Sequence, residues 1–163
     1  MSFDIFLQSF EQGQPALFPF SIVETAFQNA IRGREIDDNR YFFALEYPVP
    51  SSGEPETILM GGDAYPCVVS DSADLYCTTE PGPSGPATYS FMVNRPAAHD
   101  DFWTALLKIL QTTHSALFWP GDNALVVGQA ETIAHLPADM IETLGQPYLV
   151  STARQIVERI NGE

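Results

Sequence analysis

The sequence predicts a single α+β domain in which helices pack on one side of a mostly antiparallel or mixed sheet. Three observations lead to this prediction. The 163 residues match the usual length of one domain, and 45% of them are hydrophobic, enough for one core. The predicted strands also follow one another in runs instead of alternating with helices. No repeat or break in composition divides the chain, so we expect residues 1–163 to form one domain.

The first half of the chain contains one predicted helix and most of the predicted strands. Residues 3–10 carry apolar side chains on both faces, which is typical of a central strand. Ser21 and Glu24 form a capping-box pattern that predicts the start of a helix, and Gly33 predicts its end. The other predicted strands lie at residues 41–47, 57–60, 65–69, 74–78 and 88–93.

The second half contains the remaining predicted helices. Residues 80–86, which are mostly Pro and Gly, predict an exposed loop before it. Asp100 and Asp101 mark the start of a helix with an apolar stripe behind them. The further predicted elements are a hairpin of residues 116–119 and 124–127, one or two short helices over 132–144 that break at Pro137 and end at Gly145, a short strand at 148–150, and a closing helix capped by Ser151.

Two cysteines, Cys67 and Cys77, flank a predicted turn at residues 70–73 and could face each other across a hairpin. We expect two buried thiols in a reducing compartment. A nucleophilic role beside a distant histidine is the alternative, and no local pattern supports it.

The charge of the chain restricts its partners. Seven basic and 21 acidic residues give a net charge of −14, which argues against nucleic acid or an anionic membrane as the partner. The 54 residues from Tyr41 to Asn94 contain seven acids and no Lys or Arg, and Ile109 to Ala153 contains four acids and no base. The excess acid either serves solubility alone or places on one face a negative field that attracts a basic protein.

The second interpretation identifies a candidate partner-binding surface on the strands between residues 41 and 79. This surface combines carboxylates that have no local base with tyrosines, which can anchor an interface. The candidate residues are Glu46, Tyr47, Glu54, Glu56, Asp63, Tyr65, Asp71, Asp74 and Tyr76.

Chemistry-bearing motifs are absent from the sequence. It contains no phosphate-binding or dinucleotide-binding glycine motif, no GxSxG and no HExxH. His99, Asp100 and Asp101 could be metal ligands by type, but consecutive helical positions point about 100° apart, so helix capping explains them better. Trp103 and Trp119 lie in apolar segments and are expected in the core. We therefore expect no catalytic residue, metal or cofactor.

A cytoplasmic location is expected. No apolar run approaches 18 residues, and the first residues lack a basic stretch followed by an apolar one. The sequence thus predicts neither a membrane-spanning helix nor a secretory signal.

Three segments carry a resemblance to other proteins. Residues 1–10 (MSFDIFLQSF), 118–121 (FWPG) and 135–140 (HLPADM) resemble a group of small acidic bacterial proteins of unassigned function. In general character the chain is also similar to the immunity proteins of bacterial polymorphic and type VI secretion toxin systems, which block a toxin by binding it. The second resemblance implies a basic, toxin-like protein as the partner and supplies no site residues.

Three functional hypotheses follow. The first is a non-enzymatic binding protein of the immunity type that occludes the active site of a basic toxin. The second is a small-molecule-binding or enzymatic domain with a pocket between sheet and helices and an acid such as Glu46 or Asp63 inside it. The third is a structural subunit, which an exposed apolar patch would indicate.

Overall fold

The computed structural model describes residues 3–48, 56–60, 63–67 and 71–162, with the backbone alone considered for 56–60 and 63–67. Its helices are α1 (Phe20–Phe27), α2 (Asp100–Thr112), the 3-10 helix η1 (Ala130–His135), α3 (Ala138–Leu144) and α4 (Ala153–Ile160). Its strands are β1 (Asp4–Glu11), β2 (Gln14–Pro15), β3 (Phe18–Pro19), β4 (Ile31–Asp37), β5 (Arg40–Tyr47), β6 (Glu56–Met60), β7 (Asp63–Cys67), β8 (Asp71–Thr78), β9 (Glu80–Gly82), β10 (Gly85–Thr88), β11 (Ser90–Asn94), β12 (Ser115–Phe118), β13 (Leu125–Val127) and β14 (Tyr148–Leu149).

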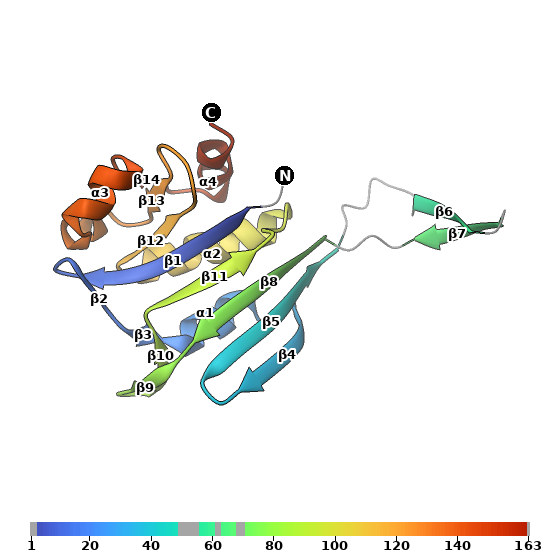
Figure 1. The fold of residues 1–163 in the computed structure, drawn as a ribbon, viewed down its shortest axis with the longest axis horizontal. Helices are drawn as coiled ribbons and strands as arrows, with labels where there is room; N and C mark the ends of the chain where they lie inside the picture. The colour runs from blue at the N-terminus through green and yellow to red at the C-terminus, as the bar shows by residue number, and fades with distance from the viewer. Residues whose placement is uncertain (1–2, 49–55, 61–62, 68–70, 163) are drawn as a thin grey trace.

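One large sheet organises the molecule (Figure 1). Its strand order is β14-β13-β12-β1-β11-β8-β5-β4, and β2 pairs with β1. Neighbouring strands are antiparallel except for β13 and β14, which are parallel. This arrangement confirms the predicted α+β class with a mixed, mostly antiparallel sheet against which helices pack. β1 lies inside the sheet between β12 and β11, as its two apolar faces predicted.

Two smaller sheets accompany the large one. β3, β10 and β9 form a three-stranded sheet, and β6 pairs with β7 in a hairpin drawn beyond the ends of β5 and β8 (Figure 1). The prediction of a loop over residues 80–86 is therefore wrong, because Glu80 pairs with Ala87 and Gly82 with Gly85 across a turn at Pro83. The prediction of a turn over residues 70–73 is also wrong for residues 71–73, which belong to β8; residue 70 lies outside the described part.

The first helix is shorter than its sequence pattern predicts. The N-cap of α1 is Pro19, whose side chain cannot accept a capping hydrogen bond, so the predicted capping box at Ser21 is wrong. The helix ends at Phe27. The residues from Ile31 onward continue as β4, with Gly33 opposite Ala44 of β5. The helical spacing extends into this segment, but its residues hydrogen-bond to β5 and therefore form a strand. Gly33 lies in this strand and does not end a helix.

The later helices begin close to their predicted positions. His99 is the N-cap of α2, where its Nδ1 accepts a hydrogen bond from the Asp101 N–H at 3.0 Å. The N-cap of α4 is Thr152 and not Ser151. Thr152 and Gln155 form a complete capping box, while the Ser151 hydroxyl donates to the Gln155 Oε1.

Most of the hydrophobic core lies between one face of the large sheet and three helices. Phe43 and Leu75 of the sheet are fully buried there against Phe102 and Leu106 of α2, and α1 and α4 contribute to the same cluster. Trp103 and Trp119 are buried in this core, as predicted.

A smaller cluster covers one end of the opposite face. It contains Ala116, Leu125 and Val127 of β12 and β13, and Leu136 and α3 pack against it. In the part of the chain that the structure describes, η1 contacts β1, whose Phe10 belongs to this small cluster. No described helix packs over the same side of the rest of β1 or of β11, β8, β5 and β4. We call this side of those five strands the open face.

Close packing at the end of α2 gives a test of the fold. A Cβ atom added at Gly128 would lie 2.7 Å from the Leu110 backbone carbon, which cannot move as a flexible side chain can. We expect Gly128→Ala to lower the free energy of unfolding by about 2–3 kcal/mol in urea titrations. Gly33→Ala is the control, because its Cβ would meet only the Ala44 methyl at 3.3 Å. Equal losses for both variants would contradict this packing.

Candidate functional site

An apolar row crosses the open face and continues onto the neighbouring strand β12. Strand register aligns Phe118, Phe6, Met92, Tyr76 and Phe42 on five neighbouring strands, β12, β1, β11, β8 and β5. Since opposed residues share a face of the sheet, all five side chains lie on the side away from α2. Tyr76 is 42% exposed and the other four are half-buried. Large apolar side chains in a continuous row on an uncovered face are typical of a binding surface.

The row consists of two aromatic pairs with a methionine between them. The Phe6 and Phe118 rings stack with their centroids 5.6 Å apart. The Phe42 and Tyr76 rings lie at 5.1 Å in a tilted arrangement. Met92, on the strand between the two pairs, contributes a flexible side chain that can adapt to different contacts.

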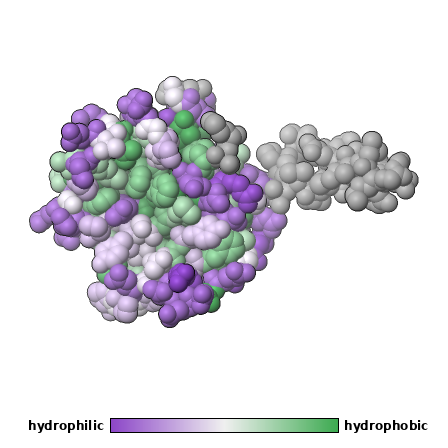
Figure 2. Space-filling view, viewed as in Figure 1, coloured by the Kyte–Doolittle hydropathy of each residue, from purple (hydrophilic) through white to green (hydrophobic). Residues whose placement is uncertain are grey.

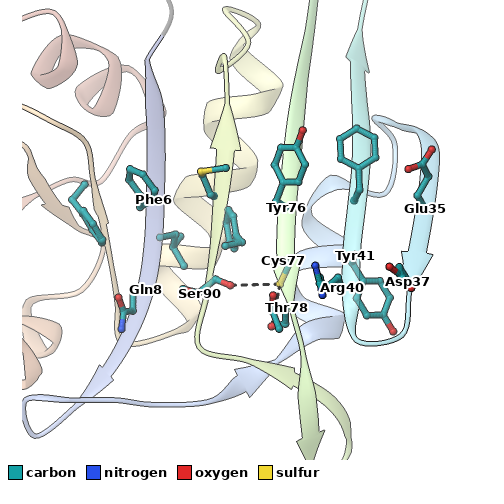
Figure 3. A pocket seen from close by; sticks show the side chains of 15 residues that line it. Phe6, Gln8, Glu35, Asp37, Arg40, Tyr41, Tyr76, Cys77, Thr78 and Ser90 are labelled. Atoms are coloured by element: carbon teal, nitrogen blue, oxygen red, sulfur yellow. Dashed lines mark hydrogen bonds between the residues drawn. The ribbon is translucent and has the colours of Figure 1, made fainter.

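A shallow depression of about 360 Å³ lies over this row (Figure 3). A second, polar row borders it, because Gln8 is opposite Ser90 on β11, and Thr78 is opposite Arg40 on β5. Figure 3 shows Phe6 and Tyr76 above this row, with Glu35 beyond Tyr76 on β4. The depression is therefore apolar along one side and polar along the other.

Carboxylates surround the apolar centre of the open face. Glu35 and Asp37 are exposed on β4, opposite Phe42 and Arg40, and neither forms an ion pair within the described residues. Asp74 lies on the same face, but the Arg95 guanidinium neutralises it at 3.1 Å. Figure 2 shows apolar surface near the centre of this side and hydrophilic surface around it.

The structure separates the residues of the predicted binding surface. Tyr76 and Asp74 lie on the open face, whereas Tyr47 and Asp71 lie on the side that the helices cover. Glu46 is half-buried near the end of β5. Glu54 and the side chains of Glu56, Asp63 and Tyr65 lie outside the described residues. The described candidates thus do not share one face, because consecutive residues of a strand point to opposite sides.

Tyr47 is buried and contributes no exposed surface. Only 5% of it is accessible, and its ring stacks on that of His99 with centroids 5.3 Å apart. Within the described residues its hydroxyl has no hydrogen-bond partner. Burial raises the pKa of this phenol well above its ordinary value, and the negative charges of Asp101 and Asp71 raise it further.

Asp71 has a structural contact that the sequence did not reveal. Its Oδ2 accepts hydrogen bonds from the backbone N–H groups of Ala98 at 2.9 Å and of His99 at 2.8 Å. These bonds attach the start of β8 to the segment that leads into α2. The Asp71 carboxylate is thus already engaged within the fold.

A second cleft of about 410 Å³ lies between α1, α2 and the end of β5. Glu46 and Asp101 line it together with Arg32 and Lys108. This cleft is the described counterpart of the pocket expected around Glu46. Its charges are mixed, while small-molecule sites are mostly apolar with a few polar groups.

Two of the three histidines come together in the fold although the sequence separates them. The His114 and His135 rings lie 4.7 Å apart. His135 Nδ1 accepts a hydrogen bond from the Gln12 N–H at 3.1 Å, and His114 Nδ1 lies 3.4 Å from the Thr132 Oγ1. Among the residues that the structure describes, no group of three or more His, Cys, Asp or Glu could hold a metal ion.

Cys77 is a buried structural thiol. Its Sγ lies within hydrogen-bond distance of the Thr88 Oγ1 at 3.2 Å, and burial raises its pKa to about 11. The predicted hairpin between the two cysteines is wrong, because Cys67 pairs with Glu56 whereas Cys77 pairs with Tyr41 and Phe91. The side chain of Cys67 lies outside the described residues.

Comparisons with known proteins identify no family for this chain. No family model matches it, and no curated protein or solved structure matches it. Among the described residues, no helix is both long enough and apolar enough to span a membrane.

The Tyr47 hydroxyl leads to a stability prediction. We expect Tyr47→Phe to leave the free energy of unfolding unchanged or to raise it by up to about 1 kcal/mol, because it removes a buried donor that has no hydrogen-bond partner among the described residues. Thr113→Val is the matched control. It removes a buried hydroxyl bonded to the Ile109 carbonyl at 2.7 Å, so it should cost about 1 kcal/mol. A larger loss for Tyr47→Phe than for Thr113→Val in urea titrations would contradict this assignment.

The raised pKa of Cys77 predicts slow alkylation. A rise from 9.0 to about 11 lowers the thiolate fraction near pH 8 roughly a hundredfold. In a Cys67→Ser variant, iodoacetamide should therefore react at least that much more slowly with the native protein than with the urea-unfolded protein. Equal rates in both states would show that the thiol is neither buried nor perturbed.

Proposed function

We propose that this protein is a non-enzymatic binding protein that engages a basic protein through the open face of its sheet. The observation that carries the proposal is the apolar row of Phe6, Met92, Tyr76 and Phe42, which no described helix covers. Phe118 continues this row on β12, where it packs against the small cluster that α3 also contacts. Aromatic side chains at the centre of an interface supply much of its binding energy, and the polar rim excludes water.

Electrostatics support a basic partner. The chain has a net charge of −14, and Glu35 and Asp37 stand at the edge of the row with no ion pair among the described residues. A negative field of this kind accelerates the encounter with a positive surface and disfavours acidic partners. The apolar row and the negative field together best fit an immunity protein that occludes the basic active site of a toxin.

Two other functions make different demands on the structure. A small-molecule site would use the cleft that Glu46, Asp101, Arg32 and Lys108 line. Self-association would use the open face, whose apolar row is the sign expected for a structural subunit. Like charges on two copies would oppose that contact, so we favour a partner of opposite charge.

Paired variants on the two sides of the sheet test the proposal. Tyr76→Ala and Phe42→Ala each remove an aromatic ring from the open face, while Ile36→Ala removes an apolar side chain that is 55% exposed on the other side of β4. Each tagged variant is used to capture proteins from the native host, and a captured basic protein is purified and titrated by calorimetry. We expect one-to-one binding that each open-face variant weakens about tenfold or more and that Ile36→Ala leaves unchanged.

Salt dependence provides a second measurement. Association with the purified partner should slow as ionic strength rises from about 50 to 200 mM, because salt screens the attraction between opposite charges. A partner that binds equally well to the open-face variants would overturn the proposal. Concentration-dependent dimerisation that Tyr76→Ala abolishes would overturn it in favour of self-association.

A further inference from the structure

We propose that the depression on the open face receives an arginine side chain of the partner, stacked on the Phe42–Tyr76 pair and paired with Glu35 and Asp37. This inference rests on the proposed function and specifies the group that the partner must present. It follows from the position of the depression, from its charge, and from an arrangement that the chain itself contains on the other side of the same sheet.

The strand order places one aromatic pair beside the carboxylates. The Phe6–Phe118 pair lies on β1 and β12, the Phe42–Tyr76 pair on β5 and β8, and β11 runs between them. Met92 of β11 is in register with Phe6 and Tyr76, so its side chain stands between the two pairs. Glu35 is opposite Phe42 on β4, at the other side of this pair. A guanidinium stacked on the Phe42–Tyr76 pair can therefore reach the β4 carboxylates, whereas β11 is three strand spacings, about 14 Å, from β4.

The charge of the depression favours a cation. The faces of aromatic rings are negative and attract a guanidinium, which stacks on them. Glu35 and Asp37 line the depression, and Arg40 is the one base among its lining residues. The Thr78 hydroxyl adds an oxygen acceptor opposite Arg40. A purely apolar anchor would instead cover these polar groups without pairing them, which costs free energy.

The opposite side of the sheet shows the same arrangement built within the chain. The guanidinium of Arg34 lies over the Phe43 ring at 5.0 Å from its centroid and bonds the Glu24 carboxylate at 2.9 Å. On the open face, the neighbouring Phe42 lies opposite Glu35 across the same pair of strands. Phe42 and Glu35 thus repeat the aromatic–carboxylate combination, with the position of the guanidinium left for a partner to fill.

A pair of peptides that differ only in charge tests the inference. The probes are acetyl-Gly-Arg-Gly-amide and the same peptide with citrulline, a neutral group of nearly identical shape, each titrated into the ¹⁵N-labelled full chain. We expect the arginine peptide to shift the backbone amides of residues 35–37, 40–42 and 76–78. We expect it to bind about fivefold or more tightly than the citrulline peptide, a preference that falls as salt increases.

Variants identify the groups responsible. The double variant Glu35→Gln/Asp37→Asn should reduce the binding of the arginine peptide to the level of citrulline, whereas Asp139→Asn/Glu142→Gln, which changes two exposed acids of α3, should have no effect. Arg40→Gln removes the one competing base in the lining and should strengthen binding severalfold. Dispersed amide spectra confirm that each variant is folded.

Equal affinities for the two peptides, or shifts outside these three segments, would overturn the inference. The proposed function is tested separately by the Tyr76→Ala and Phe42→Ala titrations with the purified partner. If those variants weaken binding of the partner while the protein binds the arginine and citrulline peptides equally, the open face is the interface and its anchor is not arginine. If the partner is insensitive to them, the proposed function itself fails.

Discussion

The alternation of side chains along each strand is the constraint on which the rest of this structure depends. Ile5 and Leu7 of β1 enter the core beneath α2, so Phe6 must point to the other side, and the same holds for Phe42 beside Phe43. Three helices cover one face of the sheet, while η1 and α3 cover only one end of the other. The strands carry apolar residues on both faces, but helices cover only one of these faces completely. The aromatic row is the apolar part of the other face.

The same constraint decides what the acidic residues can do. Asp71 and Asp74 are three positions apart in β8, yet one bonds the backbone before α2 and the other pairs with Arg95 on the open face. Charge counted along the chain thus overstates the free charge at any one place. Glu35 and Asp37 of the open face have no ion pair among the described residues. They lie on β4, an edge strand, where charged side chains also discourage unwanted strand pairing.

Apolar and acidic features have complementary roles in the proposed interface. A row of aromatic side chains alone would favour self-association and would not discriminate between partners. Carboxylates at its edge oppose contact with another acidic surface, including a second copy of this chain, and select a cationic one. The internal contact of Arg34 with Phe43 and Glu24 shows that this combination of groups already forms a stable arrangement in the protein.

The sequence alone determined the elements whose signals are local: the central strand β1, the start of α2 at His99, the hairpin of β12 and β13, and the helix break at Pro137. It also indicated an excess of acid and named Tyr76 among the candidate residues. Only the tertiary structure decided that Tyr47 is buried, that residues 31–37 join the sheet, and that Phe118, Phe6, Met92 and Phe42 align with Tyr76. The reason is physical: strand order and register bring residues from distant parts of the chain onto one face, and periodicity within a segment contains no information about which strands become neighbours.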